Sequence, residues 1–211
     1  LETRLNVLEN FNPIIPEKLK YPDVVMLGNL SPEVQIKALD QLKNRPNLII
    51  LDTMNFWMDH FRSKLDQVIK KVDVISINDE EARQLTGEYS LAKAAQLIHQ
   101  LGPKFVIIKK GEHGALLFHD QKIFSAPALP LSEVFDPTGA GDSFAGGFAG
   151  YLTQTMNFSF NNMKSAVIYG SVMASFTVEK FGAESLINSS GSSIDERLKA
   201  FKELTTFEID F

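Results

Sequence analysis

Cysteine is absent from this sequence. That absence excludes disulfide scaffolds, Cys-ligated zinc, iron–sulfur clusters and thiol nucleophiles. No apolar run approaches the ~18 residues that cross a membrane, and no signal peptide is recognisable, so we expect a cytoplasmic protein. An excess of basic residues is also missing: 26 acidic residues against 21 basic ones give a formal charge of −5. This balance disfavours a broad nucleic-acid-binding face.

What the chain does contain is typical of a globular domain. Its 211 residues are 44% hydrophobic and 22% charged, close to the averages of folded soluble domains. A chain of this length can bury a core of its own without a metal or a disulfide. We therefore expect a single α/β domain over residues 1–211.

Short apolar runs alternate with longer amphipathic segments. The apolar runs cover residues 23–28, 48–52, 72–77 and 105–109, and the segments between them predict helices over residues 31–45, 60–71, 78–85 and 91–101. Almost continuously apolar strands alternating with helices are typical of a parallel sheet covered on both faces. In such folds ligands bind at the edge formed by the carboxyl ends of the strands.

The pattern changes after Gly111. Residues 114–119 and 122–125 predict an antiparallel hairpin at the margin of the sheet. Two long helices follow over residues 141–180 and a last one over residues 194–204, while the polar segment 188–193 predicts a surface loop.

The sharpest motif is the glycine-rich segment 136–147, which opens a predicted helix. It lacks the Gly-Lys-Ser/Thr of a P-loop, and Phe144 occupies the position of the third glycine in a dinucleotide fingerprint. It differs from a nucleophile elbow by Ala145 in place of glycine, and all four histidines precede it in the chain. A hydrolase with Ser143 as nucleophile stays open as an alternative.

The segment can bind an anion without basic side chains. Small residues at Gly139, Ala140 and Gly141 let backbone N–H groups converge where the helix begins, and the helix dipole adds positive potential. Asp142 then stands where a carboxylate could take a proton from a hydroxyl that attacks a bound phosphate. The purely structural alternative is a helix cap at Asp142 preceded by a glycine turn.

Three segments of the sequence resemble motifs of a known family. The run Asp136-Pro-Thr-Gly-Ala-Gly-Asp-Ser-Phe144 is similar to the C-terminal signature of the ribokinase-like carbohydrate kinases of the phosphofructokinase-B type. Asn78-Asp-Glu-Glu81 resembles the family's Asn-x-x-Glu element. Residues 109–114 resemble its Thr-x-Gly-x-x-Gly stretch, with Lys109 where the family has threonine. The resemblance extends over residues 23–182 and implies a ribokinase-like α/β fold.

The resemblance implies ATP-dependent phosphorylation of a hydroxymethyl group on a sugar or nucleoside, with ATP and Mg²⁺ as cofactors. Asp142 would be the catalytic base, and the backbone of Gly139, Ala140 and Gly141 would stabilise the charge on the transferring phosphoryl group.

The resemblance also assigns the nucleotide side of the site. Asn78, Lys109, Gly111 and Gly114 would line the nucleotide, and Glu81 would act on Mg²⁺ through water. Structural alternatives stay open. Asn78 and Glu81 have the spacing of a helix capping box, the two glycines suit a hairpin turn, and Lys109 could contact phosphate or point to solvent.

Two further pairs belong to the predicted site. Asp136 and Thr138 resemble positions that hold a monovalent cation, K⁺, in many family members, together with carbonyls from residues 178–182. Asp52 and Asn55 end the second apolar run at the same ligand edge, where they could lie on the phosphate side or form an ordinary polar turn.

The chain begins at Leu1 without methionine, and the family's early glycine-rich sugar-binding motif has no match. We therefore expect residues 1–211 to be the C-terminal two-thirds of a longer kinase domain, with its N-terminal part and its small β-sheet lid missing. Residues 1–21 resemble chain arriving from such a lid, which often supports a homodimer in the family. A nucleotide-binding module without catalysis is the remaining alternative.

Overall fold

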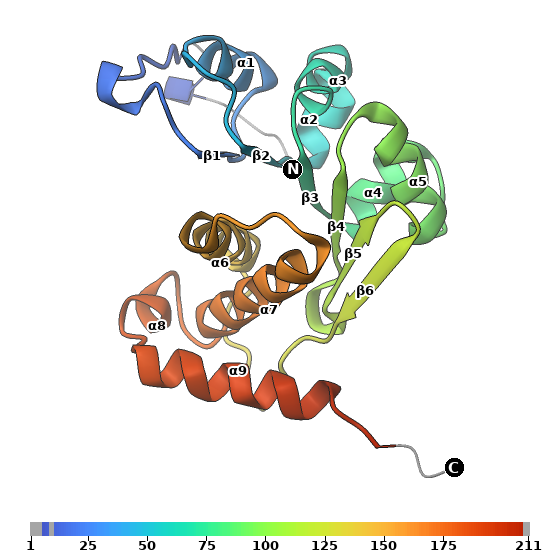
Figure 1. Cartoon of the computed structure of the whole chain (residues 1–211), viewed down its shortest axis with the longest axis vertical. Helices are drawn as coiled ribbons and strands as arrows, with labels where there is room; N and C mark the ends of the chain where they lie inside the picture. Colours follow the sequence, from blue (N-terminus) through green and yellow to red (C-terminus); the bar gives the residue numbers. More distant parts are fainter. Residues whose placement is uncertain (1–5, 9–10, 209–211) are drawn as a thin grey trace. The chain divides into compact units, whose positions relative to one another are not determined.

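The computed structural model describes residues 6–8 and 11–208. Residues 1–5 and 9–10, part of the segment expected to come from a lid, lie outside this range. The chain divides into two compact units, Leu1–Val106 and Ile107–Phe211, and the boundary falls inside one strand. Each unit is described by itself (Figure 1).

Six strands form one sheet in chain order. They are β1 (Val24–Leu27), β2 (Leu48–Asp52), β3 (Val74–Asn78), β4 (Phe105–Lys109), β5 (Ala115–His119) and β6 (Lys122–Ala126). β1 and β3 both pair with β2 in parallel, whereas β5 and β6 pair antiparallel. The predicted α/β class is confirmed: the sheet is mostly parallel, has antiparallel strands at one edge and is surrounded by helices.

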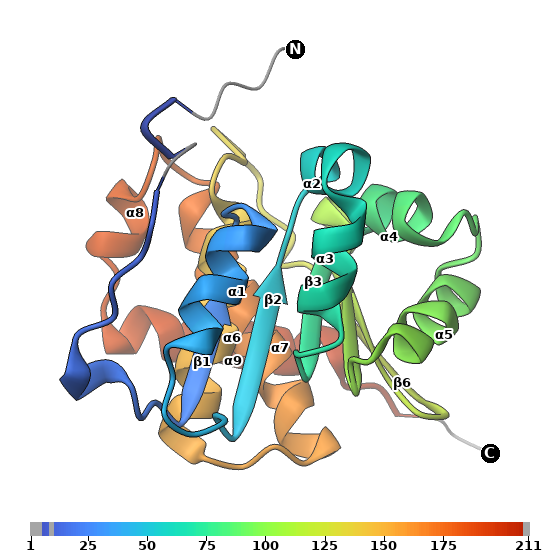
Figure 2. The same ribbon diagram turned by 90° about the horizontal axis from the view of Figure 1, so that it is seen from above.

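The first unit holds five α-helices in its described part. They are α1 (Pro32–Asp40), α2 (Asn55–His60), α3 (Arg62–Ile69), α4 (Asp79–Thr86) and α5 (Leu91–Leu101). Figure 2 shows α1 and α3 side by side over strands β1–β3. Every residue of β2 is buried, as expected for a strand of a parallel sheet that is covered by helices.

Two helix predictions in this unit are wrong at a boundary. The helix predicted over residues 31–45 begins after the Ser31 cap, as expected, but ends at Asp40. Just beyond that end, the Gln41 side chain donates to the Pro13 carbonyl at 2.9 Å and accepts from the Ile15 N–H at 3.0 Å. The end of the helix is thus tied to an earlier segment, which the periodicity of the sequence does not reveal.

The helix predicted over residues 60–71 is shorter, α3 from Arg62 to Ile69, and a separate helix that the sequence did not predict, α2, ends at His60. Phe61, with φ −133° and ψ 29°, separates α2 from α3. Its ring packs on Trp57, with the ring centroids 5.5 Å apart. Aromatic packing inside this unit accompanies the break in the helical path at Phe61.

The second unit contains four α-helices in its described part, α6 (Ala140–Thr155), α7 (Phe160–Thr177), α8 (Glu184–Ile187) and α9 (Gly191–Thr205). α7 packs against the other three and against the hairpin strands (Figure 1). Glycines let α6 and α7 approach closely. A Cβ on Gly170 would lie 2.7 Å from the Phe144 carbonyl oxygen, and one on Gly147 would lie 2.6 Å from Met173 Cγ.

The predicted hairpin is confirmed. β5 and β6 pair with His119 opposite Lys122, and Asp120 adopts a left-handed φ of 52° in the two-residue turn between them. The surface loop predicted over residues 188–193 is wrong in its second half, because α9 begins at Gly191. The Ser190 side chain accepts from the Ser193 N–H, and the Ser193 side chain accepts from the Ser190 N–H. Small polar residues that suggest a loop here start a helix.

Over residues 6–8 and 11–208, none of the helices combines the length and the apolar character that crossing a membrane requires.

Candidate functional site

The start of α6 carries the centre of the predicted site. Gly139 has a φ of 82°, in the left-handed region that glycine adopts without steric cost. The Ser143 N–H donates to the Gly139 carbonyl at 2.9 Å, and the Ala140 N–H donates to the Pro137 carbonyl at 3.1 Å. The N–H groups of Gly141 and Asp142 have no carbonyl one turn earlier in the helix. This helix end is therefore suited to an anion.

Asp142 is exposed at the third position of α6. The residue before the helix is Gly139, and it makes no side-chain capping bond. Asp142 is therefore not the N-cap that the structural alternative supposed. A carboxylate in the first turn still complements the positive end of the helix.

Lys109 lies against the same helix start. It is the last residue of β4, and its Nζ is 3.4 Å from the position that a Cβ on Gly141 would occupy. An anion bound at this helix start would be attracted both by the positive end of the helix and by the Lys109 ammonium.

Asp136 and Thr138 form a small turn just before α6. The Thr138 N–H donates to Asp136 Oδ1 at 2.9 Å. This bond, followed by one from the Thr138 hydroxyl, holds the pKa of the Asp136 carboxyl below its usual range. Asp136 therefore stays negatively charged at lower pH than an ordinary aspartate does.

The same turn is attached to the segment that follows α7. The N–H groups of Phe135 and Asp136 both donate to the Val178 carbonyl, at 2.7 and 3.2 Å. The structure thus brings Asp136 next to Val178, the first residue of the segment 178–182, and a cation there stays a prediction. The Val178 carbonyl already has two amide donors, so a cation at this turn would depend on other carbonyls of the segment.

Gly111 and Gly114 shape the connection between β4 and β5. Both have positive φ values, 55° and 81°, and the Lys110 N–H donates to the Gly114 carbonyl at 2.7 Å. A Cβ on Gly114 would lie 2.0 Å from the Ala126 carbonyl oxygen. The turn therefore leaves no room for a side chain at Gly114 and strains one at Gly111, and the contact of these glycines with a nucleotide stays a prediction.

In the first unit, Asn78 and Glu81 form a capping box at the start of α4. The Glu81 N–H donates to Asn78 Oδ1 at 2.7 Å, and the Asn78 N–H donates to Glu81 Oε2 at 2.8 Å. The structural alternative is correct for this pair. The box also holds the carboxylate of Glu81, a residue that is only 6% exposed, in one orientation after the carboxyl end of β3.

Asp52 and Asn55 follow the neighbouring strand. Asp52 ends β2, is 7% exposed and accepts from the Thr53 N–H at 3.0 Å. Asn55 begins α2 and donates to the Gln84 side chain.

Sequence reasoning overlooked Thr53 and Ser76, which have buried hydroxyls without a hydrogen-bond partner within the described ranges. A single hydroxyl residue within an apolar strand, such as Ser76, or directly after one, such as Thr53, carries no signal in the sequence.

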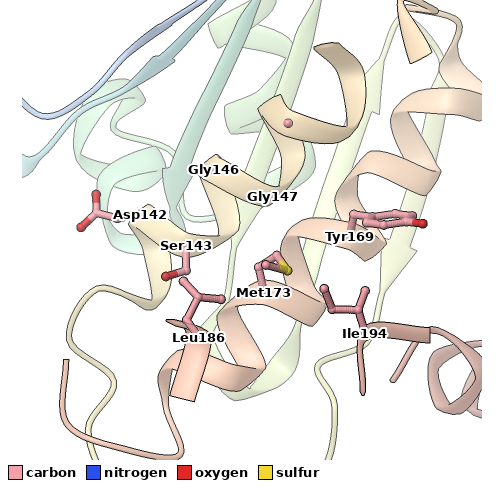
Figure 3. A pocket seen from close by; sticks show the side chains of 9 residues that line it. Asp142, Ser143, Gly146, Gly147, Tyr169, Met173, Leu186 and Ile194 are labelled. Atoms are coloured by element: carbon pink, nitrogen blue, oxygen red, sulfur yellow. The ribbon is translucent and has the colours of Figure 1, made fainter. Parts of the chain in front are cut away.

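A cavity of about 540 Å³ opens beside Asp142. Figure 3 shows it over α6, with the Asp142 carboxylate pointing away from the apolar side chains that line it. Its lining is Asp142, Ser143, Gly146, Gly147, Gly150, Tyr169, Met173, Leu186 and Ile194.

Ser143 meets another hydroxyl here instead of a base. The Thr177 hydroxyl donates to Ser143 Oγ at 2.6 Å. No histidine in the described part of the chain hydrogen-bonds to this serine, so the structure offers no histidine base for the hydrolase alternative. The contact with Thr177 was also not predicted, because 34 residues separate the two positions.

Within residues 6–8 and 11–208, no three acidic or histidine side chains cluster so that they could hold a metal ion. Mg²⁺ does not need such a cluster, since it is usually bound by one or two carboxylates, several waters and the phosphates of a substrate. The single oriented carboxylate of Glu81 fits that mode of binding.

Comparison with known proteins supports the family resemblance of the sequence motifs. Residues 9–189 match the family described as pfkB family carbohydrate kinase. The cytidine kinase of Thermococcus kodakarensis is 36% identical over 143 residues, which are 65% of this chain and 50% of that protein. The chain belongs to the pfkB family of carbohydrate kinases, and it spans about half the length of this relative.

Solved structures show the same fold. The ribokinase of Arabidopsis thaliana, solved with ribose and ATP, is 25% identical with a TM-score of 0.67, over 84% of this chain and 56% of that one. A putative ribokinase II from E. coli, solved with ATP and Mg²⁺, is 22% identical with a TM-score of 0.69, over 84% of this chain and 59% of that one.

Proposed function

We propose that this protein carries out ATP-dependent phosphorylation of a hydroxymethyl group on a sugar or nucleoside. The observation that carries the proposal is the start of α6. An exposed carboxylate, Asp142, follows a glycine turn whose open N–H groups lie next to the Lys109 ammonium. Membership of the pfkB family supports the same reaction class.

In this proposal the chain contributes positioning and electrostatics. Asp142 accepts the proton of the acceptor hydroxyl as the hydroxyl oxygen attacks the terminal phosphorus of ATP; the bond from that phosphorus to the bridging oxygen breaks, and ADP leaves. The backbone of Gly139, Ala140 and Gly141 and the helix dipole stabilise the negative charge on the transferred phosphoryl group, and Lys109 adds a positive charge. Phosphoryl transfer depends mostly on such effects, because little covalent chemistry is left to the protein.

The remaining predicted residues are assigned to ATP and its ions. Asn78 and the turn between Gly111 and Gly114 line the nucleotide. Glu81 holds Mg²⁺ through water, and Asp52 and Asn55 lie on the phosphate side. Bound Mg²⁺ would neutralise charge on the phosphates. The Arabidopsis and E. coli structures, which contain ATP and ATP with Mg²⁺, support these two ligands.

We also propose a site for K⁺. It would use Asp136, Thr138 and carbonyls of residues 178–182 other than that of Val178, which accepts from two amides. A single kinase domain, a cytoplasmic location and a homodimer formed through a lid belong to the same proposal.

The reaction class is tested by measuring ADP release with ATP and Mg²⁺ in the presence of single acceptors. The panel contains cytidine and other nucleosides, ribose, fructose and sugar phosphates. We expect ADP release to depend on one class of acceptor, whose phosphate ester is then identified by mass spectrometry. ATP binding without transfer would favour the non-catalytic module, and p-nitrophenyl ester hydrolysis that Ser143→Ala abolishes would favour a hydrolase.

The role of Lys109 is tested by Lys109→Met. Removing the ammonium beside Gly141 takes a positive charge from the phosphoryl site, so we expect kcat to fall about 10-fold. Lys110→Met is the matched control, since its residue is next in the chain and lies beyond the end of β4. Steady-state kinetics at saturating acceptor measure both variants. Equal losses of kcat in the two variants would contradict the role assigned to Lys109.

A further inference from the structure

Thr177 touches the first turn of α6 from the interior of the second unit. It is the last residue of α7 and only 3% exposed. Its hydroxyl donates to Ser143 Oγ at 2.6 Å, and its methyl carbon lies 3.8 Å from the position of a Cβ on Gly139. One buried side chain therefore bonds to Ser143 and lies beside the open space at Gly139, the two ends of this turn.

Gly139 and Ser143 are also joined to each other. The Ser143 N–H donates to the Gly139 carbonyl in the first bond of the helix. Gly141 and Asp142, whose N–H groups and carboxylate are assigned to the reaction, lie between these two residues in the chain. A rotation of the turn about the helix axis would move all of these groups at once.

The alternative use of the Thr177 hydroxyl is weaker. It could donate to the Met173 carbonyl one turn earlier in α7, but that distance is 3.4 Å. A hydrogen bond in a buried setting is strengthened by the low local dielectric, whereas a buried hydroxyl without a partner is costly. The short bond to Ser143 is thus the main constraint that this side chain provides.

We propose that Thr177 and Ser143 form a positioning pair that holds the first turn of α6, and with it Asp142, in the orientation required for phosphoryl transfer. The pair acts through the helix start and does not touch the reacting atoms. This inference rests on the proposed kinase function, although the hydrogen bond can also be tested without it.

The experiment compares Thr177→Val, Ser143→Ala, the double variant and Thr177→Ser. Valine has the shape of threonine without its hydroxyl, and serine keeps the hydroxyl. Ser171→Ala is the matched control, because the Ser171 hydroxyl donates only to the Val167 carbonyl inside α7. Two quantities are measured on every variant: kcat and KM for ATP at saturating acceptor, and hydrogen exchange of the Ser143 amide.

We expect Thr177→Val and Ser143→Ala each to lower kcat about 10-fold while KM for ATP changes less than about 2-fold, because misplacing a catalytic group affects the chemical step. The Ser143 amide should exchange about 10-fold faster, since its bond to Gly139 opens more often. The double variant should be no worse than either single one, as expected for partners in one bond. Thr177→Ser should restore both quantities, and Ser171→Ala should change neither.

Wild-type kcat and unchanged exchange in Thr177→Val would overturn the inference, and so would additive losses in the double variant or an equal loss in Ser171→Ala. A protein that is an active kinase but has normal pair variants refutes the pair alone. A wild-type protein without kinase activity refutes the proposed function, and hydrogen exchange then still decides whether the pair holds the turn.

Discussion

Replacing Asp142 by Asn is expected to lower kcat by at least about 100-fold, because the amide cannot accept the proton of the attacking hydroxyl. Asn has nearly the same shape as Asp, and the side chain is exposed, so the fold and ATP binding should be retained. Turnover is measured by coupled ADP release, and ATP affinity by isothermal titration calorimetry.

The control for this variant is Asp120→Asn in the turn of the β5–β6 hairpin. Asp120 is exposed and has a φ of 52°, a conformation that Asn tolerates well. Asp120→Asn removes one negative charge from the same unit as Asp142→Asn does, but at the hairpin turn instead of the start of α6. This control variant should therefore leave kcat unchanged. Turnover of Asp142→Asn at the wild-type rate would refute the assignment of the base.

The largest expected effect on stability comes from Gly114→Ala. The new Cβ would lie 2.0 Å from the Ala126 carbonyl oxygen and 2.6 Å from the carbonyl carbon of Pro127, both backbone atoms that cannot move independently. The φ of 81° adds strain for any residue with a Cβ. We expect the free energy of unfolding to fall by about 3 kcal/mol or more, as the sum of steric overlap and left-handed strain.

Gly111→Ala separates these two causes. Gly111 also has a positive φ, 55°, but nothing lies within 4 Å of the position that a Cβ there would occupy. This variant should lose only about 1–2 kcal/mol, the cost of a left-handed conformation alone. Urea denaturation followed by circular dichroism measures both values. Equal losses would mean that the contact with the Ala126 carbonyl is relieved easily.

Elements with a strong local signal could be predicted from the sequence. β2 and β4 have the predicted bounds because their residues are almost all apolar, and α5 coincides with the predicted helix 91–101 because its apolar residues recur at the helical period. The errors lie where distant residues decide. Gln41 bonds to Pro13 beyond the end of α1, and Phe61 packs on Trp57 between α2 and α3.

In the candidate site, too, some features follow from short segments of the sequence and others depend on distant residues. The glycine-rich segment and Asp142 follow from the order of residues in the chain, and so does the capping box of Asn78 and Glu81, because each lies within one short segment. The position of Lys109 next to Gly141 and the bond between Thr177 and Ser143 join residues that are more than 30 positions apart.

By itself, the sequence determined the α/β class, the resemblance to the pfkB family and a helix start suited to an anion, since backbone propensities and short motifs act over a few residues. Only the tertiary structure decided which side chains surround that helix start. Their contacts depend on how the end of β4, α6 and α7 pack against one another. Such packing is set by the shapes and hydrogen bonds of segments that lie far apart in the sequence.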